Sequence, residues 1–388
     1  MNTIVIIGGG IGGLTLAIAL RQRDIIAEVY EATPELRPAG AGILMPPNAM
    51  QVFGQFSLAA EIARAGMPLR SGDILDVQAG LLQHADLDAV AERFGFPTIA
   101  IHRGRLHQAL VAALDPGQLH LGKAFVALTK EADGVRVRFT DGDEVRARAV
   151  VGADGLRSAV RQQLFPESRL RYSGQSSYRA VAPLTLPPSF DGVSWEVWGP
   201  GCRFGFAAIA PDEVYWFVTL AAAAGALRGQ TPFKPRLAAL FAAFPPPIGE
   251  LIDATPEAAI INTDIHDLRQ IPHWRVGRVG LLGDAAHATT PNLGQGGAQA
   301  VEDASVLARC LVANNNPEVA FGAYERRRRA KAAMVVKRSW QFGKLPHMRN
   351  PILQAARNLL VRGTPASVTR RQLEQLYRID EGPIGLLH

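Results

Sequence analysis

Cysteine is nearly absent from this 388-residue chain, which contains only Cys202 and Cys310. Two cysteines cannot build a disulfide framework, and neither stands in the spacing of a metal site. We therefore expect no metal and a reducing, cytoplasmic setting. Charge of one sign does not dominate either, since 41 Lys and Arg stand against 35 Asp and Glu. Internal repeats and low-complexity tracts are also missing, so the composition is that of a globular protein.

A long hydrophobic run free of glycine is missing too. The apolar segment from Ile4 to Leu20 contains glycines and follows no basic residue, so we expect neither a signal peptide nor a membrane span. The densest basic run, Arg326 to Arg329, lacks interleaved aromatics, which favours a solvated helix face over nucleic-acid binding. The amphipathic run 346–365 is expected to cap a domain, without stable membrane insertion.

The first thirty residues predict a strand, a tight turn, a helix and a second strand, which is one βαβ unit. Within the turn, Gly8, Gly10 and Gly13 satisfy the pattern G-x-G-x-x-G. Such glycines permit a tight turn, close approach of a pyrophosphate and close packing of helix on strand. The helix N-terminus supplies N–H donors and a partial positive charge. The pattern predicts a dinucleotide site.

An acidic residue, Glu31, closes the second expected strand 23 residues after Gly8. A carboxylate at this point accepts hydrogen bonds from ribose hydroxyls, which suits NAD or FAD rather than NADP. The alternative is a tight turn followed by an ordinary exposed glutamate. This first loop does not distinguish NAD from FAD.

The remainder of the chain alternates between helical and strand patterns. An amphipathic helix is expected over "IHRGRLHQALVAAL", in which Arg105 faces solvent, and a hairpin about Asp141-Gly142 precedes a buried strand at 149–152. Short aromatic-rich segments from about 172 to 264 predict an inserted antiparallel sheet. The βα pattern resumes at Gly277, and a helical tail extends to Tyr377, broken near Pro346 and Pro365.

Two further motifs follow in order: "VVGADGLRSAVR" at 150–161 and "GRVGLLGDAAHATTPNLGQGG" at 277–297. With the first loop they resemble the single-component FAD-dependent aromatic hydroxylases of the p-hydroxybenzoate hydroxylase fold, in particular the urate and salicylate hydroxylase-like branch. The resemblance implies an α/β fold: a Rossmann-like FAD-binding domain, an inserted mainly antiparallel β-sheet substrate domain and a helical C-terminal region. The expected ranges are 1–72, 98–171 and 265–340 for the first, 73–97 and 172–264 for the second, and 341–388 for the third.

The resemblance places Asp284 on the ribitol chain of FAD and the loop Pro291 to Gly297 at the pyrimidine edge of the flavin. A helix N-terminus there stabilises an anionic reduced flavin. For Asp284 the alternative is a helix N-cap, and for Asp154 it is a strand-to-helix corner. His287 is expected to be structural. The full set of FAD-binding residues implied by the resemblance is Gly8, Gly10, Ile11, Gly12, Gly13, Glu31, Ala32, Leu44, Arg103, Val126, Asp154, Asp284, Pro291, Gly294, Gln295, Gly296 and Gly297.

The substrate residues are expected in the inserted sheet. Arg203 and Tyr215 lie 12 residues apart around "APDE", a spacing that puts both on one face of a hairpin. In the urate-hydroxylating branch an Arg and a Tyr at matching positions face the substrate, whereas Arg179 replaces an Asn of that branch. We expect Arg179, Arg203 and Tyr215 to bind substrate, and Arg203, Tyr215 and Pro291 to be catalytic. The alternative for the sheet residues is surface or interdomain packing.

The resemblance implies an FAD-dependent monooxygenase that hydroxylates an aromatic or heteroaromatic small molecule through a flavin C4a-hydroperoxide. O2 is the oxidant, and NAD(P)H visits transiently as reductant, since no second G-x-G-x-x-G exists. Two alternatives stay open: a flavin-dependent epoxidase or prenyl-lipid oxidoreductase on the same scaffold, and a non-enzymatic flavin or nucleic-acid module. We expect no nucleic-acid partner and a monomer or homodimer.

Overall fold

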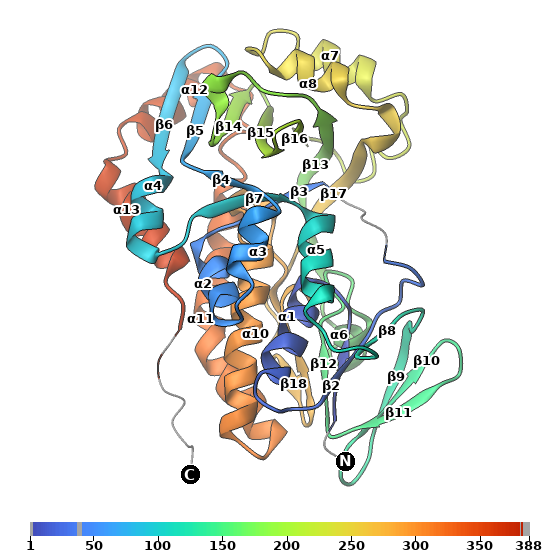
Figure 1. Cartoon of the computed structure of the whole chain (residues 1–388). Helices are drawn as coiled ribbons and strands as arrows, with labels where there is room; N and C mark the ends of the chain where they lie inside the picture. The colour runs from blue at the N-terminus through green and yellow to red at the C-terminus, as the bar shows by residue number, and fades with distance from the viewer. Residues whose placement is uncertain (1–2, 37–40, 381, 383–388) are drawn as a thin grey trace.

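The central layer of the molecule is a six-stranded sheet in the order β18-β19-β12-β1-β2-β8. The computed structural model, which describes residues 3–36, 41–380 and 382, is drawn in Figure 1. The strands of this sheet are β1 (Ile4–Ile7), β2 (Ala27–Tyr30), β8 (Leu119–His120), β12 (Ala149–Gly152), β18 (Arg275–Val276) and β19 (Val279–Leu281). All run parallel except β18, which pairs antiparallel with β19. Parallel strands buried on both faces explain their continuous apolar sequences.

Helices pack on this sheet, and the predicted βαβ unit is confirmed. Its helix α1 (Ile11–Arg21) is buried along almost its whole length, because it lies between the sheet and α10 (Gly296–Ala313), with α5 (Arg103–Ala112) alongside. Glycine allows this close packing. A Cβ at Gly13 would lie 2.1 Å from the carbonyl oxygen of Gly8, and one at Gly12 would lie 2.6 Å from the side chain of Leu282. The helix α11 (Pro317–Phe342) covers α10.

The second layer is a seven-stranded, mainly antiparallel sheet in the order β17-β13-β16-β15-β14-β5-β6, which confirms the predicted insertion. Its strands are β5 (Ser71–Asp76), β6 (Gly80–Asp86), β13 (Leu170–Pro183), β14 (Val193–Gly199), β15 (Cys202–Ala210), β16 (Glu213–Ala221) and β17 (Ile261–Leu268). The helices α7 (Lys234–Phe241) and α8 (Ile248–Ala254) contribute to the apolar core on one face. Figure 1 shows this sheet above the first one, so the molecule has two parts.

Smaller elements connect the two large sheets. A three-stranded sheet of β3 (Gly42–Met45), β7 (Thr98–His102) and β4 (Met67–Leu69) lies between them, and the predicted hairpin about Gly142 belongs to another, formed by β9 (Phe125–Lys130), β10 (Val135–Phe139) and β11 (Glu144–Ala147). The remaining helices are α2 (Pro47–Gln55), α3 (Ala59–Arg64), α4 (Leu87–Phe94), α6 (Ala159–Leu164), α9 (Asp284–His287), α12 (Pro351–Arg362) and α13 (Ala366–Tyr377), with 3-10 turns at Pro188–Phe190, Glu257–Ala259 and Pro291–Leu293. The helical tail thus breaks near Pro346 and Pro365 as predicted.

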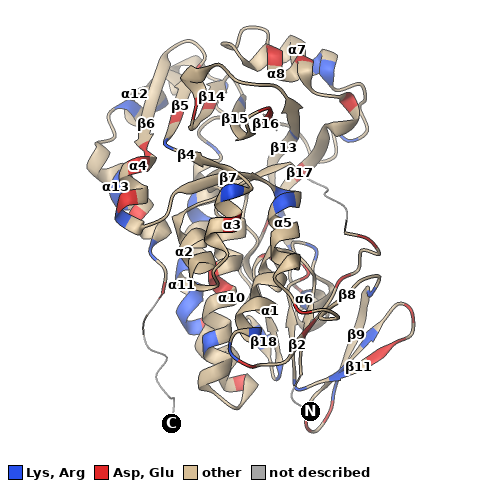
Figure 2. Ribbon diagram, viewed as in Figure 1, with Lys and Arg blue, Asp and Glu red and all other residues tan. Residues whose placement is uncertain are grey.

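The prediction of a solvated face at Arg326 to Arg329 fails at Arg328, although Arg326 is exposed as predicted. Arg328 is only 1% exposed and donates to Glu302 and Asp303 of α10, each at 2.6 Å. Figure 2 shows acidic residues of α10 beside the basic stretch of α11. One arginine of this basic run is therefore part of the core, because its counter-charges lie on a neighbouring helix.

Within the described residues, no helix has both the length and the apolar composition needed to cross a bilayer.

Candidate active site

The first glycine loop leaves an open, electropositive corner at the start of α1. Gly8 has φ +110° and donates its N–H to Tyr30 at the end of β2. No described atom lies within 4 Å of the position that a Cβ would take on Gly10, the residue before the helix. The first turn of α1 contains no acidic residue, so the positive end of the helix faces this open space without a carboxylate of its own.

Glu31 lies beside that loop rather than standing free on the surface. Its carboxylate accepts from the N–H of Gly9 at 2.7 Å and from the N–H and hydroxyl of Thr33 at 2.9 and 2.8 Å. His107 of α5, which the sequence reading missed, contacts the carbonyl of Gly9 through Nε2 at 2.7 Å. The carboxylate and the loop therefore form one unit at the carboxyl end of β2, next to exposed Ala32.

The late glycine loop meets the first one, although the two are about 280 residues apart in sequence. Gly294 has φ +61° and precedes α10, and the position of a Cβ on Gly297 lies 3.8 Å from Ile11 at the start of α1. The side chain of Gln295 points into the protein, where Oε1 accepts from Asn48 at 3.1 Å. Two helix N-termini thus converge, and any contact that Gln295 makes with a ligand here comes from its backbone.

Asp284 lies beside the start of α10, and the N-cap alternative for it is wrong. The capping residue of α9 is Gly283, with φ +60°, and a Cβ on Gly296 would lie 3.9 Å from Oδ1 of Asp284. The side chain is accessible to solvent yet closely surrounded by protein, and this burial raises its pKa, while His287, Arg103 and Arg161 oppose the rise. A carboxylate in this setting can accept a hydrogen bond from a ligand hydroxyl.

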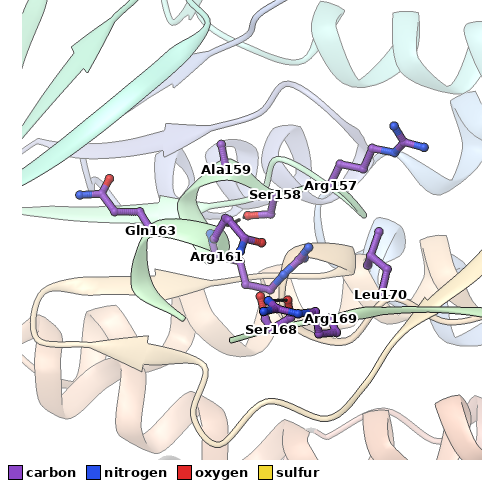
Figure 3. Close-up of a pocket in the computed structure, with 9 residues that line it drawn as sticks. Arg157, Ser158, Ala159, Arg161, Gln163, Ser168, Arg169 and Leu170 are labelled. Atoms are coloured by element: carbon purple, nitrogen blue, oxygen red, sulfur yellow. Dashed lines mark hydrogen bonds between the residues drawn. The ribbon is translucent and has the colours of Figure 1, made fainter. Parts of the chain in front are cut away.

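The second motif forms a strand-to-helix corner. Both carboxylate oxygens of Asp154 accept bonds from its own corner, from the Ser158 hydroxyl at 2.5 Å and the Val160 N–H at 3.1 Å. Arg161 is buried and donates to the carbonyl of Ala285 at 3.1 Å, which ties the corner to α9. A surface pocket of about 760 Å³ adjoins the motif, and Figure 3 shows Arg157 extending away from the other side chains that line it.

The predicted hairpin face is confirmed. Tyr215 on β16 pairs with Ala207, Arg203 on β15 pairs with Thr219, and Arg179 on β13 pairs with Phe217, so the three predicted residues share one face of the sheet. The ring of Tyr215 lies against Gly42 of β3, where a Cβ would come within 2.3 Å of it. This face therefore meets β3, the strand that contains Leu44, and Leu44 packs in the same cluster as Tyr215.

Burial raises the pKa of Tyr215 to about 12, even though the charges of Arg179 and Arg203 oppose the rise. The phenol is therefore neutral near pH 7 and can both donate and accept a hydrogen bond. This favours a role in which Tyr215 orients a substrate by a hydrogen bond over one in which it deprotonates the substrate.

Arg203 is 1% exposed, and each nitrogen of its guanidinium donates a hydrogen bond within the protein. It donates to Thr219 at 2.9 Å, to Glu196 at 2.9 Å and to Asn292, in the late loop, at 2.5 Å. The sequence analysis did not predict a role for Glu196 or Asn292, although Asn292 lies within the third motif, residues 277–297. Arg203 thus joins the substrate sheet to the late loop, and its charge is balanced by a carboxylate.

Arg179 is different, because it is half-buried and no described residue forms a hydrogen bond or ion pair with its side chain. Its charge opposes the rise in the pKa of Tyr215. It also lowers the pKa of Arg103, which burial lowers more strongly. Arg179 is thus a cation without a counter-charge among the described residues, close enough to Tyr215 and Arg103 to influence both.

The other predicted residues fall in varied surroundings. Pro291 is exposed at the start of its 3-10 turn, and Val126 on β9 is 44% exposed. Arg105, which was expected to face solvent, is half-buried: it also pairs with Glu213 at 2.6 Å and so ties α5 to the β15–β16 hairpin. His287 pairs with Asp303 at 2.6 Å, which is the structural role expected of it.

A buried polar network below the start of α10 was not foreseen. Glu302 of α10 accepts from Asn48 at 2.6 Å, from Arg328 at 2.6 Å and from Lys331 at 2.7 Å. The sequence signal that could have indicated this network is the acidic pair Glu302-Asp303 in the middle of an otherwise largely apolar helix. The part of the chain that the structure describes contains no group of His, Cys, Asp or Glu suited to a metal ion.

The donor set fits FAD: two helix N-termini face one space, an open glycine cradle leaves room for a phosphate, and a carboxylate stands at each end. The model of a family described as "FAD binding domain" matches residues 1–339. This chain belongs to that family.

Named relatives agree with this assignment. The chain is 41% identical over 360 residues to the aurachin C monooxygenase/isomerase of Stigmatella aurantiaca, covering 93% of this chain and 94% of the relative. It is 35% identical over 380 residues to the 2-heptyl-3-hydroxy-4(1H)-quinolone synthase of Pseudomonas aeruginosa PAO1, covering 97% of each. The crystal structure of Klebsiella pneumoniae HpxO with FAD and uric acid superposes with a TM-score of 0.89 at 27% identity, covering 99% of this chain and 98% of that one.

The predicted family and fold class are therefore confirmed. The protein is an FAD-dependent monooxygenase of the aromatic-hydroxylase group, an α/β protein with the p-hydroxybenzoate hydroxylase fold.

Proposed function

We propose that this enzyme uses NAD(P)H and O2 to hydroxylate a bicyclic nitrogen heteroaromatic of the 4-quinolone type, with Arg179 facing its ionised ring oxygen. In the balanced reaction, substrate, O2, NAD(P)H and one proton give hydroxylated substrate, water and NAD(P)⁺. The observation that carries the proposal is the half-buried guanidinium of Arg179, without a partner among the described residues, on the sheet face that Tyr215 shares.

The residues around the open space suit one FAD molecule. The first turn of α1, with Gly8 to Gly13, would hold the pyrophosphate together with Arg103. Glu31 and Ala32 would meet the adenosine ribose, with Val126 nearby, and Asp284 would meet the ribitol chain. The backbone from Pro291 to Gly297, with Leu44 opposite, would border the flavin ring. When bound, FAD supplies the electron transfer and oxygen chemistry of hydroxylation.

The charge balance assigns different tasks to the two arginines on the sheet. Glu196 already neutralises Arg203, so Arg203 positions Asn292 and the late loop. The charge of Arg179 is free to stabilise a substrate anion and thereby lower the substrate's pKa, which makes the ring carbon beside the ionised oxygen electron-rich. The neutral phenol of Tyr215 would orient the substrate by a hydrogen bond, and the carbonyl of Pro291 would face the same space.

The relatives and Arg179 support the substrate class together. The two named relatives, at 41% and 35% identity, span nearly the whole chain, and the name of the second contains a 3-hydroxy-4(1H)-quinolone. The solved complex at 27% identity contains uric acid, whereas Arg179 stands where the resemblance to the urate-hydroxylating branch leads us to expect an Asn. An arginine there favours a substrate whose oxygen ionises beside it.

The reductant would approach at the second motif. The pocket of about 760 Å³ carries Arg157, Arg161 and Arg169 along its lining, which suits the phosphates of NAD(P)H. We further propose a cytoplasmic monomer or homodimer with the domain ranges given above. The two buried thiols, which are free, fit a reducing compartment.

The decisive experiment is anaerobic stopped-flow reduction of the holoenzyme by NADH and by NADPH. Reduction is measured with no addition and with 2-alkyl-4-quinolones, urate, an aminohydroxybenzoate and an isolated alkene. The proposal predicts that a 4-quinolone accelerates flavin reduction most and is recovered hydroxylated after oxygen is admitted. Acceleration by the alkene alone, with an epoxide as product, would support the epoxidase alternative instead.

A further inference from the structure

The helix α12 presents its apolar side to solvent. Ile352, Leu353, Leu359 and Leu360 are 76%, 55%, 74% and 74% exposed. At 100° per residue these four positions fall on one side of the helix. We refer to these four residues as the α12 apolar face.

The opposite side of the same helix is polar and buried. Arg357 is 3% exposed and donates to Asp76 of β5 at 2.7 Å, and its guanidinium lies 4.9 Å from the ring of Trp198. Asn358, beside it, accepts from Arg357 at 2.7 Å. These contacts fix the rotation of the helix, so the exposure of the apolar side is set by a buried ion pair rather than by a loose terminus.

The chain segment that contains the α12 apolar face carries positive charge only. From Lys344 to Leu373 the sequence contains no Asp or Glu, while Arg349, Arg362, Arg370 and Arg371 are exposed. Arg362 donates to the carbonyl of Leu81, whose side chain at the β6 end of the hairpin is itself 53% exposed. Figure 2 shows blue and no red on α12, at the outer end of the substrate sheet.

A pocket adjoins the start of this helix. It has a volume of about 460 Å³ and is lined by apolar residues such as Leu220, Leu227 and Leu240, together with Arg236 and Arg349. Arg349 directly precedes Asn350, the N-cap of α12. Two guanidinium groups beside apolar walls suit a phosphate group that carries an alkyl chain.

We propose that the α12 apolar face and the arginines around it dock the enzyme on the surface of an anionic lipid bilayer. A helix with apolar residues on one side and basic residues at its borders lies in the plane of the interface, with the apolar side among the acyl chains. Arginines at its borders then meet anionic headgroups. A second copy of the chain fits less well, because a two-fold contact would bring these arginines against each other. This inference does not depend on the proposed substrate.

The test is co-sedimentation of the full-length holoenzyme with lipid vesicles. One set is pure phosphatidylcholine, and the other contains about 30% phosphatidylglycerol. We expect the partition coefficient to be about tenfold or more higher on the anionic vesicles and to fall as NaCl is raised. The double variant Leu359→Gln/Leu360→Gln should lower it by about tenfold or more. The matched control, Ile26→Gln/Val312→Gln, changes two residues that are 61% and 52% exposed outside this surface and should bind like the wild type.

Circular dichroism and bound-FAD content establish that each variant is folded. Absence of binding to anionic vesicles, or binding that Leu359→Gln/Leu360→Gln does not weaken, overturns the proposal. A wild-type dimer that the same double variant converts to monomer, as measured by light scattering, overturns it as well and assigns the face to a second copy.

Discussion

Arg203 and Arg179 lie on one face of the sheet, but their different bonding partners give them different functions. Arg203 and Arg179 are both cations near Tyr215, and the sequence led us to expect both to bind substrate. Glu196 bonds Arg203, whereas no described residue bonds the side chain of Arg179. The pairing depends on β14 and β15 lying side by side, which residue type alone does not reveal.

Replacement of Arg179 by Gln tests this division. We expect kcat/KM for the preferred substrate to fall about a hundredfold, since one preorganised charge opposite a developing anion contributes about 3 kcal/mol. Bound FAD should be unchanged. Because the lost cation no longer lowers the substrate's pKa, activity of the variant should recover as pH is raised. Arg179→Lys, which keeps the charge, should retain more activity, and a variant as active as wild type at neutral pH would remove Arg179 from the mechanism.

His347 makes stability depend on pH in a defined window. Its pKa is lowered from 6.5 to about 4, first by burial and then by the charge of Arg203. Its Nδ1 donates to the carbonyl of Gly343 and its Nε2 is bonded to Thr219, which suits the neutral ring. Between pH 6.5 and 4 the unfolded chain binds a proton that the folded chain does not. The free energy of unfolding should therefore fall by up to about 3 kcal/mol as pH drops through this range.

Urea denaturation at several pH values measures this dependence. His347→Gln should flatten the curve between pH 6.5 and 4 without changing it above pH 7. An unaltered slope in the variant would place the origin of the acid sensitivity elsewhere.

At the scale of elements, glycines of one loop have separable roles. A Cβ on Gly10 meets no described atom within 4 Å, whereas one on Gly13 would lie 2.1 Å from the carbonyl oxygen of Gly8. Gly10→Ala should therefore fold with nearly wild-type stability but bind FAD at least about tenfold more weakly, since its methyl group enters the pyrophosphate space. Gly13→Ala should destabilise the fold itself by about 2 kcal/mol or more. Thermal unfolding of the apoproteins and FAD titration distinguish the two, and equal effects would contradict the assignment.

Elements defined by local pattern were predictable, and contacts between distant elements were not. The βαβ unit, the Asp141-Gly142 hairpin and the breaks near Pro346 and Pro365 follow from periodicity and from glycine and proline chemistry. The predicted solvated face at Arg326 to Arg329 failed at Arg328, because Arg328 pairs with Glu302, which belongs to a different helix. A charged run indicates a surface only when no opposite charges pack against it.

At the scale of the whole molecule, one buried arginine joins the two large parts. Arg203 of the substrate sheet donates to Asn292 of the late loop, 89 positions further along the chain. Arg203→Ala would leave the half-buried Glu196 without its cation and Asn292 without its donor, and we expect a loss of about 2 kcal/mol in the free energy of unfolding. The double variant Arg203→Met/Glu196→Gln removes both charges and should recover much of that loss. A wild-type unfolding curve for Arg203→Ala, measured in urea, would show that the bridge contributes nothing.

The convergence of α1 and α10 on one space is the claim on which the rest depends. It is tested most directly by titrating the apoprotein with FAD and following flavin and protein fluorescence. The account predicts saturable, tight binding of one FAD per chain, with Gly10→Ala and Asp284→Ala each weakening it. An apoprotein that takes up no FAD, or one whose affinity for FAD neither variant alters, would contradict the account.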